Sequence, residues 1–147
     1  MSLLISTRKA AVLILVLSIF LGVNGCSKKI TFPVSPVIPT AEPSARVNKT
    51  SEDEYRVRLE VSGMALPERL TPAKKHYVVW IETEGQGTRN IGELRNNRGM
   101  MANRSRASFE STTRFKPTQI FVTAENSTNL QWPGDHVIFR SNVFRVK

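Results

Sequence analysis

Alternation between apolar and charged residues is the feature that most restricts the fold of this chain. Residues 55–61 read YRVRLEV, in which every second residue is apolar and the residues between them are charged. A period of two gives an extended strand one buried and one exposed face. Residues 107–115 alternate in a similar way, and no stretch after residue 26 keeps helical periodicity over eleven residues. The sequence therefore predicts an all-β domain.

Other segments complete this prediction. Residues 76–81, HYVVWI, are apolar on both faces, as is typical of a central strand. Further strands are predicted at 90–94, 119–124 and 136–146, with turns or loops between them. Residues 51–147 number 97, close to the roughly 100 residues of an immunoglobulin-like fold. We predict an immunoglobulin-like β-sandwich of about seven strands that buries Trp80, with an open Greek-key barrel as the alternative.

The first 25 residues predict a signal peptide. The chain of 147 residues is long enough for one ordinary domain. Arg8 and Lys9 precede an uncharged apolar run at 10–23. Its 14 residues suit the apolar region of a signal peptide and fall short of the roughly 20 that span a bilayer.

That run closes on Val23-Asn24-Gly25-Cys26, which resembles the lipobox of bacterial lipoproteins. The resemblance implies cleavage before Cys26, a diacylglyceryl (palmitate-type) lipid on its sulfur and acylation of the new amino terminus. Ser27 follows the cysteine, which by resemblance favours the outer membrane. The alternatives are an uncleaved anchor helix and a buried structural cysteine. Because Cys26 is the only cysteine, the chain holds no internal disulfide or multi-cysteine metal site.

Residues 26–50 predict a lipidated, proline-rich tether ahead of a domain at 51–147. Four of the eight prolines lie in this segment, which favours extended polyproline II geometry. Lys28 and Lys29 lie close to the predicted lipid and are expected either to contact anionic headgroups or to be solvated. The alternation of Ile30, Phe32 and Val34 is also compatible with an added edge strand.

A second resemblance concerns the domain. The residues that carry it are Leu59-Glu-Val-Ser-Gly63, Leu66-Pro67, Tyr77-Val-Val-Trp80 and Asn90-Ile-Gly92. They resemble the extracytoplasmic domain of anti-sigma-K-type factors over about half of its length. The resemblance implies a fold of that kind. It does not carry over anti-sigma activity, because we find no sigma-binding domain and no transmembrane helix beyond the signal segment.

The sequence offers little for catalysis. His76 and His136 are the only histidines, and no metal-ligand spacing accompanies them. His136 follows Asp135 and would need Glu82 or Glu125 brought close to it to form an acid–base or metal site. We therefore predict no enzyme activity, no catalytic residues, no metal and no cofactor.

Basic residues concentrate in one stretch of the domain. Residues 89–106 contain Arg89, Arg95, Arg98, Arg104 and Arg106 against one acid, so they carry a net charge of +4. Guanidinium groups suit phosphate and carboxylate oxygens. Trp132, in a predicted loop, is the other candidate contact, although it would equally serve to cap the core. The alternative for the arginines is a solvated loop that binds no partner. The absence of aromatic residues from 89–106 argues against nucleic acid as a ligand.

Taken together, these features predict a non-enzymatic, lipid-anchored envelope protein that presents a binding or assembly module in the periplasm or at the outer membrane. Its partners would be the membrane, through the lipid, and an acidic envelope protein or anionic glycan. The alternatives are an extracytoplasmic sensor or regulatory subunit, and a binder of anionic glycan or lipopolysaccharide through the arginine-rich loop.

Overall fold

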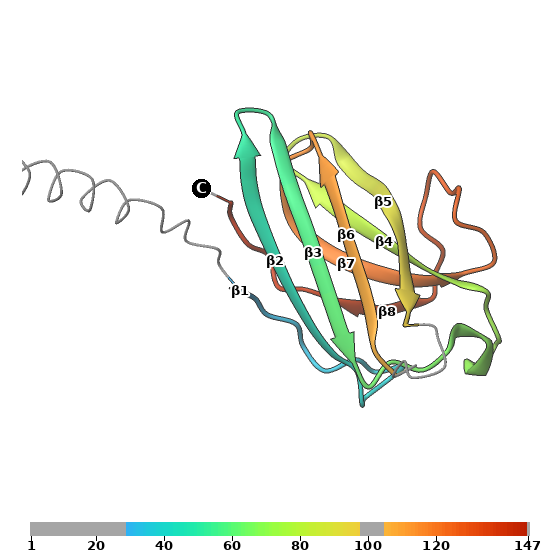
Figure 1. Ribbon diagram of the computed structural model, residues 1–147. Helices are drawn as coiled ribbons and strands as arrows, with labels where there is room; N and C mark the ends of the chain where they lie inside the picture. Colours follow the sequence, from blue (N-terminus) through green and yellow to red (C-terminus); the bar gives the residue numbers. More distant parts are fainter. Residues whose placement is uncertain (1–28, 98–104, 147) are drawn as a thin grey trace, which may run out of the picture.

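The computed structural model describes residues 29–97 and 105–146. This part of the chain holds eight strands and a short 3-10 turn, η1 (Pro67–Arg69), but no α-helix (Figure 1). The strands are β1 (Lys29–Ile30), β2 (Glu42–Ser51), β3 (Glu54–Ser62), β4 (His76–Thr83), β5 (Gly87–Asn96), β6 (Ala107–Thr113), β7 (Pro117–Glu125) and β8 (Val137–Arg140). The predicted all-β class is confirmed.

The strands form one curled sheet in the order β1-β2-β3-β6-β5-β4-β7-β8, and all neighbouring pairs are antiparallel. Strand β5 joins the two halves of the sheet. It pairs with β4 from residue 87 to residue 94, and then Arg95 and Asn96 pair with β6. The β4–β5 register shifts where Val79 pairs with Gly92 and Trp80 pairs with Asn90, which leaves Ile91 as an extra residue. Such a bulge bends a strand, and here it lies before the change of partner.

The two halves of the sheet share one apolar core. The alternation predicted for residues 55–61 is confirmed, since the four apolar residues of this stretch are buried and the three charged residues between them are exposed. Val79 and Ile81 of β4 belong to the same core, as do alternate residues of β7. Burial of such side chains is the main favourable contribution to folding, at about 25 cal/mol per Å² of apolar surface.

A second, smaller cluster lies on the other face of β4 and β7. Val78, Trp80 and Phe121 form it, with Leu130 and Val137 packed against them. Trp80 is fully buried, as predicted, and its Nε1–H donates to Thr123 Oγ1 at 2.9 Å. Its neighbours Val79 and Ile81 face the main core, so Trp80 packs on the outer face of the sheet. The immunoglobulin-like prediction had placed it in the interior between the sheets.

The described part of the proline-rich segment does not form a separate tether. Strand β2 begins at Glu42 and pairs with β3 along its length, and β1 pairs with β2. Between them, Ile38 and Ala41 are buried in the main core, and the Ser35 hydroxyl donates to the carbonyl of Ile138. The predicted domain start at residue 51 is therefore too late, because apolar residues of 29–50 are needed to cover the core. An edge strand is present as β1, but it covers only Lys29–Ile30 and does not reach Phe32 or Val34.

The end of the chain is less regular than predicted. Within 136–146, only Val137–Arg140 is a strand. Beyond it, the amide of Asn142 donates to the carbonyl of Thr31, and the amide of Phe144 donates to the carbonyl of Thr118. The backbone after β8 thus bonds to two separate segments rather than continuing one ladder.

Gly63, which ends β3, allows the chain to pass the N-terminal segment at very short range. Its φ is +67°, and a Cβ built there would lie 1.9 Å from the carbonyl oxygen of Thr40. The Thr40 hydroxyl donates to the Gly63 carbonyl at 2.9 Å, which fastens the two segments together. Only glycine satisfies both the backbone angle and the close approach.

We expect Gly63→Ala to lower the free energy of unfolding by at least about 2 kcal/mol, because left-handed strain and a steric clash add together. Gly85→Ala is the matched control, since Gly85 has a φ of +82° but open space around its Cβ position. That variant should lose only the strain, about 1 kcal/mol. Urea unfolding followed by circular dichroism measures both, and equal losses would contradict the role given to the Thr40 contact.

Candidate functional site

The loop between β7 and β8, residues 126–136, is held firmly against the sheet. The Asn90 side-chain amide on β5 donates to the carbonyls of Thr128 at 2.8 Å and Leu130 at 3.0 Å. The Leu130 side chain packs against the smaller cluster around Trp80. The first half of the loop is therefore fixed by two hydrogen bonds and an apolar contact.

The second half of the loop is fixed by Glu125 at the end of β7. One oxygen of this buried carboxylate accepts the backbone N–H of Gly134 at 2.8 Å. A Cβ at Gly134 would lie 2.8 Å from the carboxylate, so only glycine permits this approach without displacing Glu125. A backbone bond to a charged acceptor is stronger than a neutral one.

Trp132 lies between these two attachment points and extends into solvent, with 73% of its surface exposed. The indole therefore does not cap the core, and the contact role of Trp132 stays a prediction. It is one of four large apolar residues exposed in the described part, with Val34, Val37 and Val143. An exposed tryptophan on a restrained loop loses little conformational entropy on binding, which suits a contact residue.

The arginines of the predicted basic loop do not form one patch. Arg89 and Arg95 are six residues apart on β5, about 20 Å at strand spacing. Arg89 stacks over the Phe115 ring at 5.0 Å, whereas the Arg95 guanidinium pairs with Glu93 at 2.6 Å. Arg106 lines a shallow hollow of about 420 Å³ together with acidic residues of β2 and β3. Arg98, Arg104 and the predicted lipid-bearing Cys26 lie outside the described residues.

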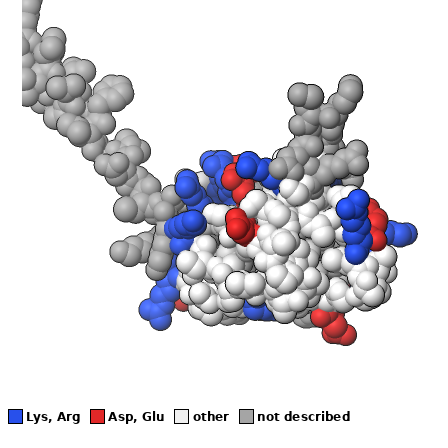
Figure 2. Space-filling model, turned by 90° about the horizontal axis from the view of Figure 1, so that it is seen from below, with Lys and Arg blue, Asp and Glu red and all other residues white. Residues whose placement is uncertain are grey.

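The distribution of charge agrees with this dispersal. Figure 2, which views the domain from the η1 end, shows lysines and arginines in several separate groups, some beside acidic residues, with a broad uncharged area between them. A single strongly basic face is not visible from this end. On this face, the described basic residues are dispersed.

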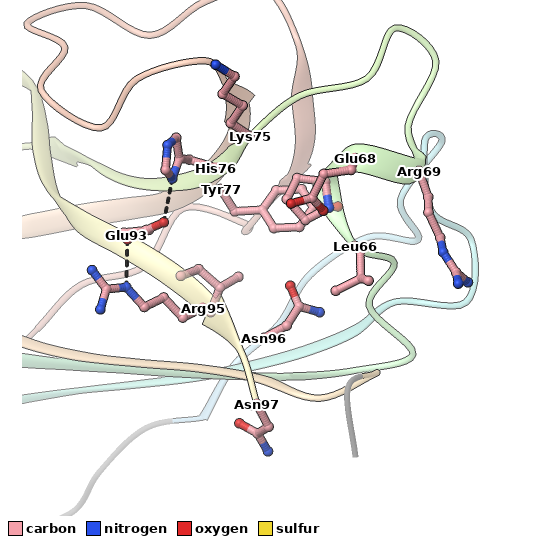
Figure 3. A pocket seen from close by; sticks show the side chains of 12 residues that line it. Leu66, Glu68, Arg69, Lys75, His76, Tyr77, Glu93, Arg95, Asn96 and Asn97 are labelled. Carbon is pink, nitrogen blue, oxygen red and sulfur yellow. Dashed lines mark hydrogen bonds and ion pairs between the residues drawn. The ribbon is translucent and has the colours of Figure 1, made fainter. Parts of the chain in front are cut away.

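A cavity of about 460 Å³ lies between η1 and the adjoining ends of β4 and β5 (Figure 3). Glu93 forms the polar centre of its wall. One of its oxygens accepts from His76 Nδ1 at 2.7 Å, and the other accepts from Arg95 Nε at 2.6 Å. Tyr77 lines the same cavity, and its hydroxyl donates to the Ala65 carbonyl at 3.0 Å.

His76, Glu93 and Arg95 form a hydrogen-bonded triad, and the pKa of Glu93 indicates that its role is structural. Burial by itself raises the pKa of Glu93, but the hydrogen bonds from His76 and Arg95 outweigh it, and the net pKa lies below the ordinary value of 4.5. A carboxylate with a lowered pKa is a weak proton acceptor at neutral pH. Burial, and then the nearby Glu68 carboxylate, raise the pKa of Tyr77, so its hydroxyl remains protonated. Sequence reasoning missed this triad, because only strand register places residues 76, 93 and 95 together.

No hydrogen bond or ion pair joins His136 to Glu82 or Glu125, the partners considered for it, among the described residues. Glu125 is engaged by the Gly134 amide, and Glu82 accepts from the hydroxyl of Thr88. Across residues 29–97 and 105–146, no three histidine, cysteine or acidic side chains are grouped so that they could share a metal ion.

Comparisons with known protein families, curated proteins and solved structures find no match for this chain. Within the segments that the structure describes, no helix is long and apolar enough to cross a membrane. Inference about function therefore rests on the residues themselves.

The Glu93 triad has a measurable consequence for stability. A carboxyl group whose pKa is lowered by folding stabilises the folded state above its unfolded pKa, and this contribution is lost as pH falls through the folded pKa. We expect Glu93→Gln to be less stable than the parent at pH 7 and to lose less further stability below about pH 4.5. Arg95→Gln removes one of the two donors to Glu93, so its stability at pH 7 should lie between those of the parent and Glu93→Gln. Urea midpoints from pH 7 to pH 3 measure this, and parallel curves for parent and Glu93→Gln would contradict it.

Proposed function

We propose that this protein is a lipid-anchored envelope protein that works by binding a partner protein through the Trp132 loop, not by catalysis. The observation that carries the proposal is the placement of the two ends of the domain. The described chain begins at β1, three residues after Cys26, whereas the β7–β8 loop lies on the side of the domain away from β1 (Figure 1). An anchor at Cys26 would leave the loop that carries Trp132 on the side of the domain away from the point of attachment.

The anchor is supported by the sequence pattern at residues 8–26. A basic start, an apolar run, a small residue and the only cysteine occur in the order that lipoprotein processing requires. A single acyl chain binds a membrane marginally, whereas two or three hold a protein stably. By resemblance to bacterial lipoproteins, Ser27 after the cysteine favours the outer membrane.

The binding role is supported by the restrained exposure of Trp132. Large, exposed aromatic side chains contribute most to protein interfaces when their loops are already ordered. The hydrogen bonds from Asn90 and the Gly134–Glu125 contact provide that order. By comparison, Arg89 and Arg95 are separated and engaged within the domain, which favours a Trp132 contact over glycan binding through these arginines.

The fold supports a binding role without adding chemistry. We interpret the curled sheet as a sandwich of immunoglobulin-like type whose two halves remain joined through β5. The shared core between β3 and β4 and the antiparallel strand order favour this interpretation. Domains of this type commonly bind through loops at the ends of their strands, and residues 126–136 form such a loop.

We expect Trp132→Ala to remove the partner while leaving the domain folded. Loss of a central aromatic contact weakens binding by about 2 kcal/mol or more, roughly thirtyfold in Kd. The measurement is in-cell crosslinking of a tagged full-length chain followed by mass spectrometry of the recovered complexes. Val143→Ala is the control, because Val143 is equally exposed but follows β8 beside residue 31. Equal recovery of the same partner by parent and Trp132→Ala would contradict the assignment.

We expect Cys26→Ala to release the chain from the membrane fraction. Without the sulfur, no thioether forms, and the remaining contacts are too weak for stable attachment. Fractionation of cells shows the release, and intact-mass measurement of the parent should show the added lipid and the loss of residues 1–25. A parent chain of unmodified mass would refute the anchor.

A further inference from the structure

Three cations lie side by side on the outer face of the sheet near its first strand. Lys29 of β1 pairs in register with Arg46 of β2, which pairs in register with Arg58 of β3. Directly opposed residues on antiparallel strands share a face, with Cβ atoms about 5 Å apart. All three are exposed, and their neighbours Ile30, Ala45 and Leu59 are buried on the opposite face. We refer to Lys29, Arg46 and Arg58 as the basic row.

Most of this row is not neutralised within the domain. Arg58 pairs with Glu110 of β6 at 2.9 Å, and Arg56 shares that carboxylate at 3.6 Å. Lys29 and Arg46 make no ion pair with any described residue, so Arg46 is flanked by a cation on each side. Like charges directly opposite each other on neighbouring strands destabilise a sheet. Such an arrangement is costly unless an anionic partner contacts it.

The position of the row relative to the anchor indicates what that partner is. This step rests on the proposed lipid at Cys26. Lys29 is the third residue after Cys26, and an extended chain spans at most about 3.6 Å per residue, so the two Cα atoms can be no more than about 11 Å apart. Since the lipidated residue is at the bilayer surface, β1 must lie next to that surface.

We propose that the outer face of β1–β3 rests on the bilayer and that the basic row contacts anionic phospholipid headgroups. Each lysine or arginine at such a surface strengthens attachment about fivefold. The lipid supplies attachment, and the row sets orientation. The face that rests on the membrane is then the one bearing Lys29, Arg46 and Arg58, and the Trp132 loop remains accessible.

The test uses the lipidated full-length protein, reconstituted into vesicles of phosphatidylcholine alone or mixed with phosphatidylglycerol. A fluorophore is placed at Asn48→Cys on the outer face of β2, at Gln131→Cys beside Trp132, or at Val143→Cys beyond β8. Energy transfer to a dye-labelled lipid then reports which site is nearest to the bilayer. We expect the greatest transfer from position 48 in the phosphatidylglycerol vesicles. High salt should remove this excess, because it shortens the range of charge interactions to about 3 Å at 1 M.

The matched variants separate the basic row from net charge. Lys29→Gln with Arg46→Gln should remove the excess transfer from position 48. Lys74→Gln with Lys75→Gln, which removes the same charge beside β4, should keep it. The proposal would be overturned by equal transfer from all three positions or by greatest transfer from position 143. It would also be overturned if the excess transfer from position 48 did not depend on the lipid charge and on salt. A chain without lipid at Cys26 is recognised by its mass before reconstitution, so failure of the anchor is distinguished from failure of the orientation.

Discussion

The shared apolar core between the two halves of the sheet is the constraint on which the rest of the molecule depends. Leu59 on one half and Ile81 on the other are fully buried in it. Neither half could exclude water from its apolar face alone, because a sheet must bury that face against a second layer. Strand β5 joins the two halves by pairing with β4 and then, beyond Leu94, with β6. The curl also forms the cavity beside Glu93, where β5 leaves β4 near η1.

Local patterns in the sequence predicted the strands but not the extent of the domain. Residues 55–61 and 76–81 carry their own signal, because burial follows directly from their spacing. The segment before residue 51 was predicted to be a tether because of its prolines, and nothing local showed that Ile38 and Val47 complete the core. Proline is tolerated at position 43 because β1 reaches only Ala45 and Arg46, which leaves that part of β2 at the sheet edge. Burial of these apolar side chains in the core therefore outweighed the preference of the prolines for an extended tether.

The candidate site was also only partly predictable, because local sequence identifies residues but not the contacts that other strands make with them. Trp132 was identified from its loop context, but its exposure depends on Asn90 and Glu125, which hold the loop from other strands. The arginines were identified by composition, which does not reveal that β5 places Arg89 and Arg95 at opposite ends of one strand. Side-chain partners across a sheet are set by register, and register is a property of paired strands rather than of either strand alone.

If Cys26 carries the proposed lipid, the position of β1 also restricts how far the domain reaches from that anchor. A tether of 24 residues in polyproline geometry would extend several tens of ångströms and allow wide exploration of the envelope. With β1 beginning at Lys29 and β2 at Glu42, part of that length is instead paired in the sheet, and Ile38 and Ala41 between the two strands pack in the core. A domain of about 100 residues has a radius of gyration of about 13 Å, so Trp132 would be held within a few tens of ångströms of the bilayer. A partner that contacts the proposed Trp132 site would then have to approach the membrane surface, which favours another envelope protein over a diffusing ligand bound far from the bilayer.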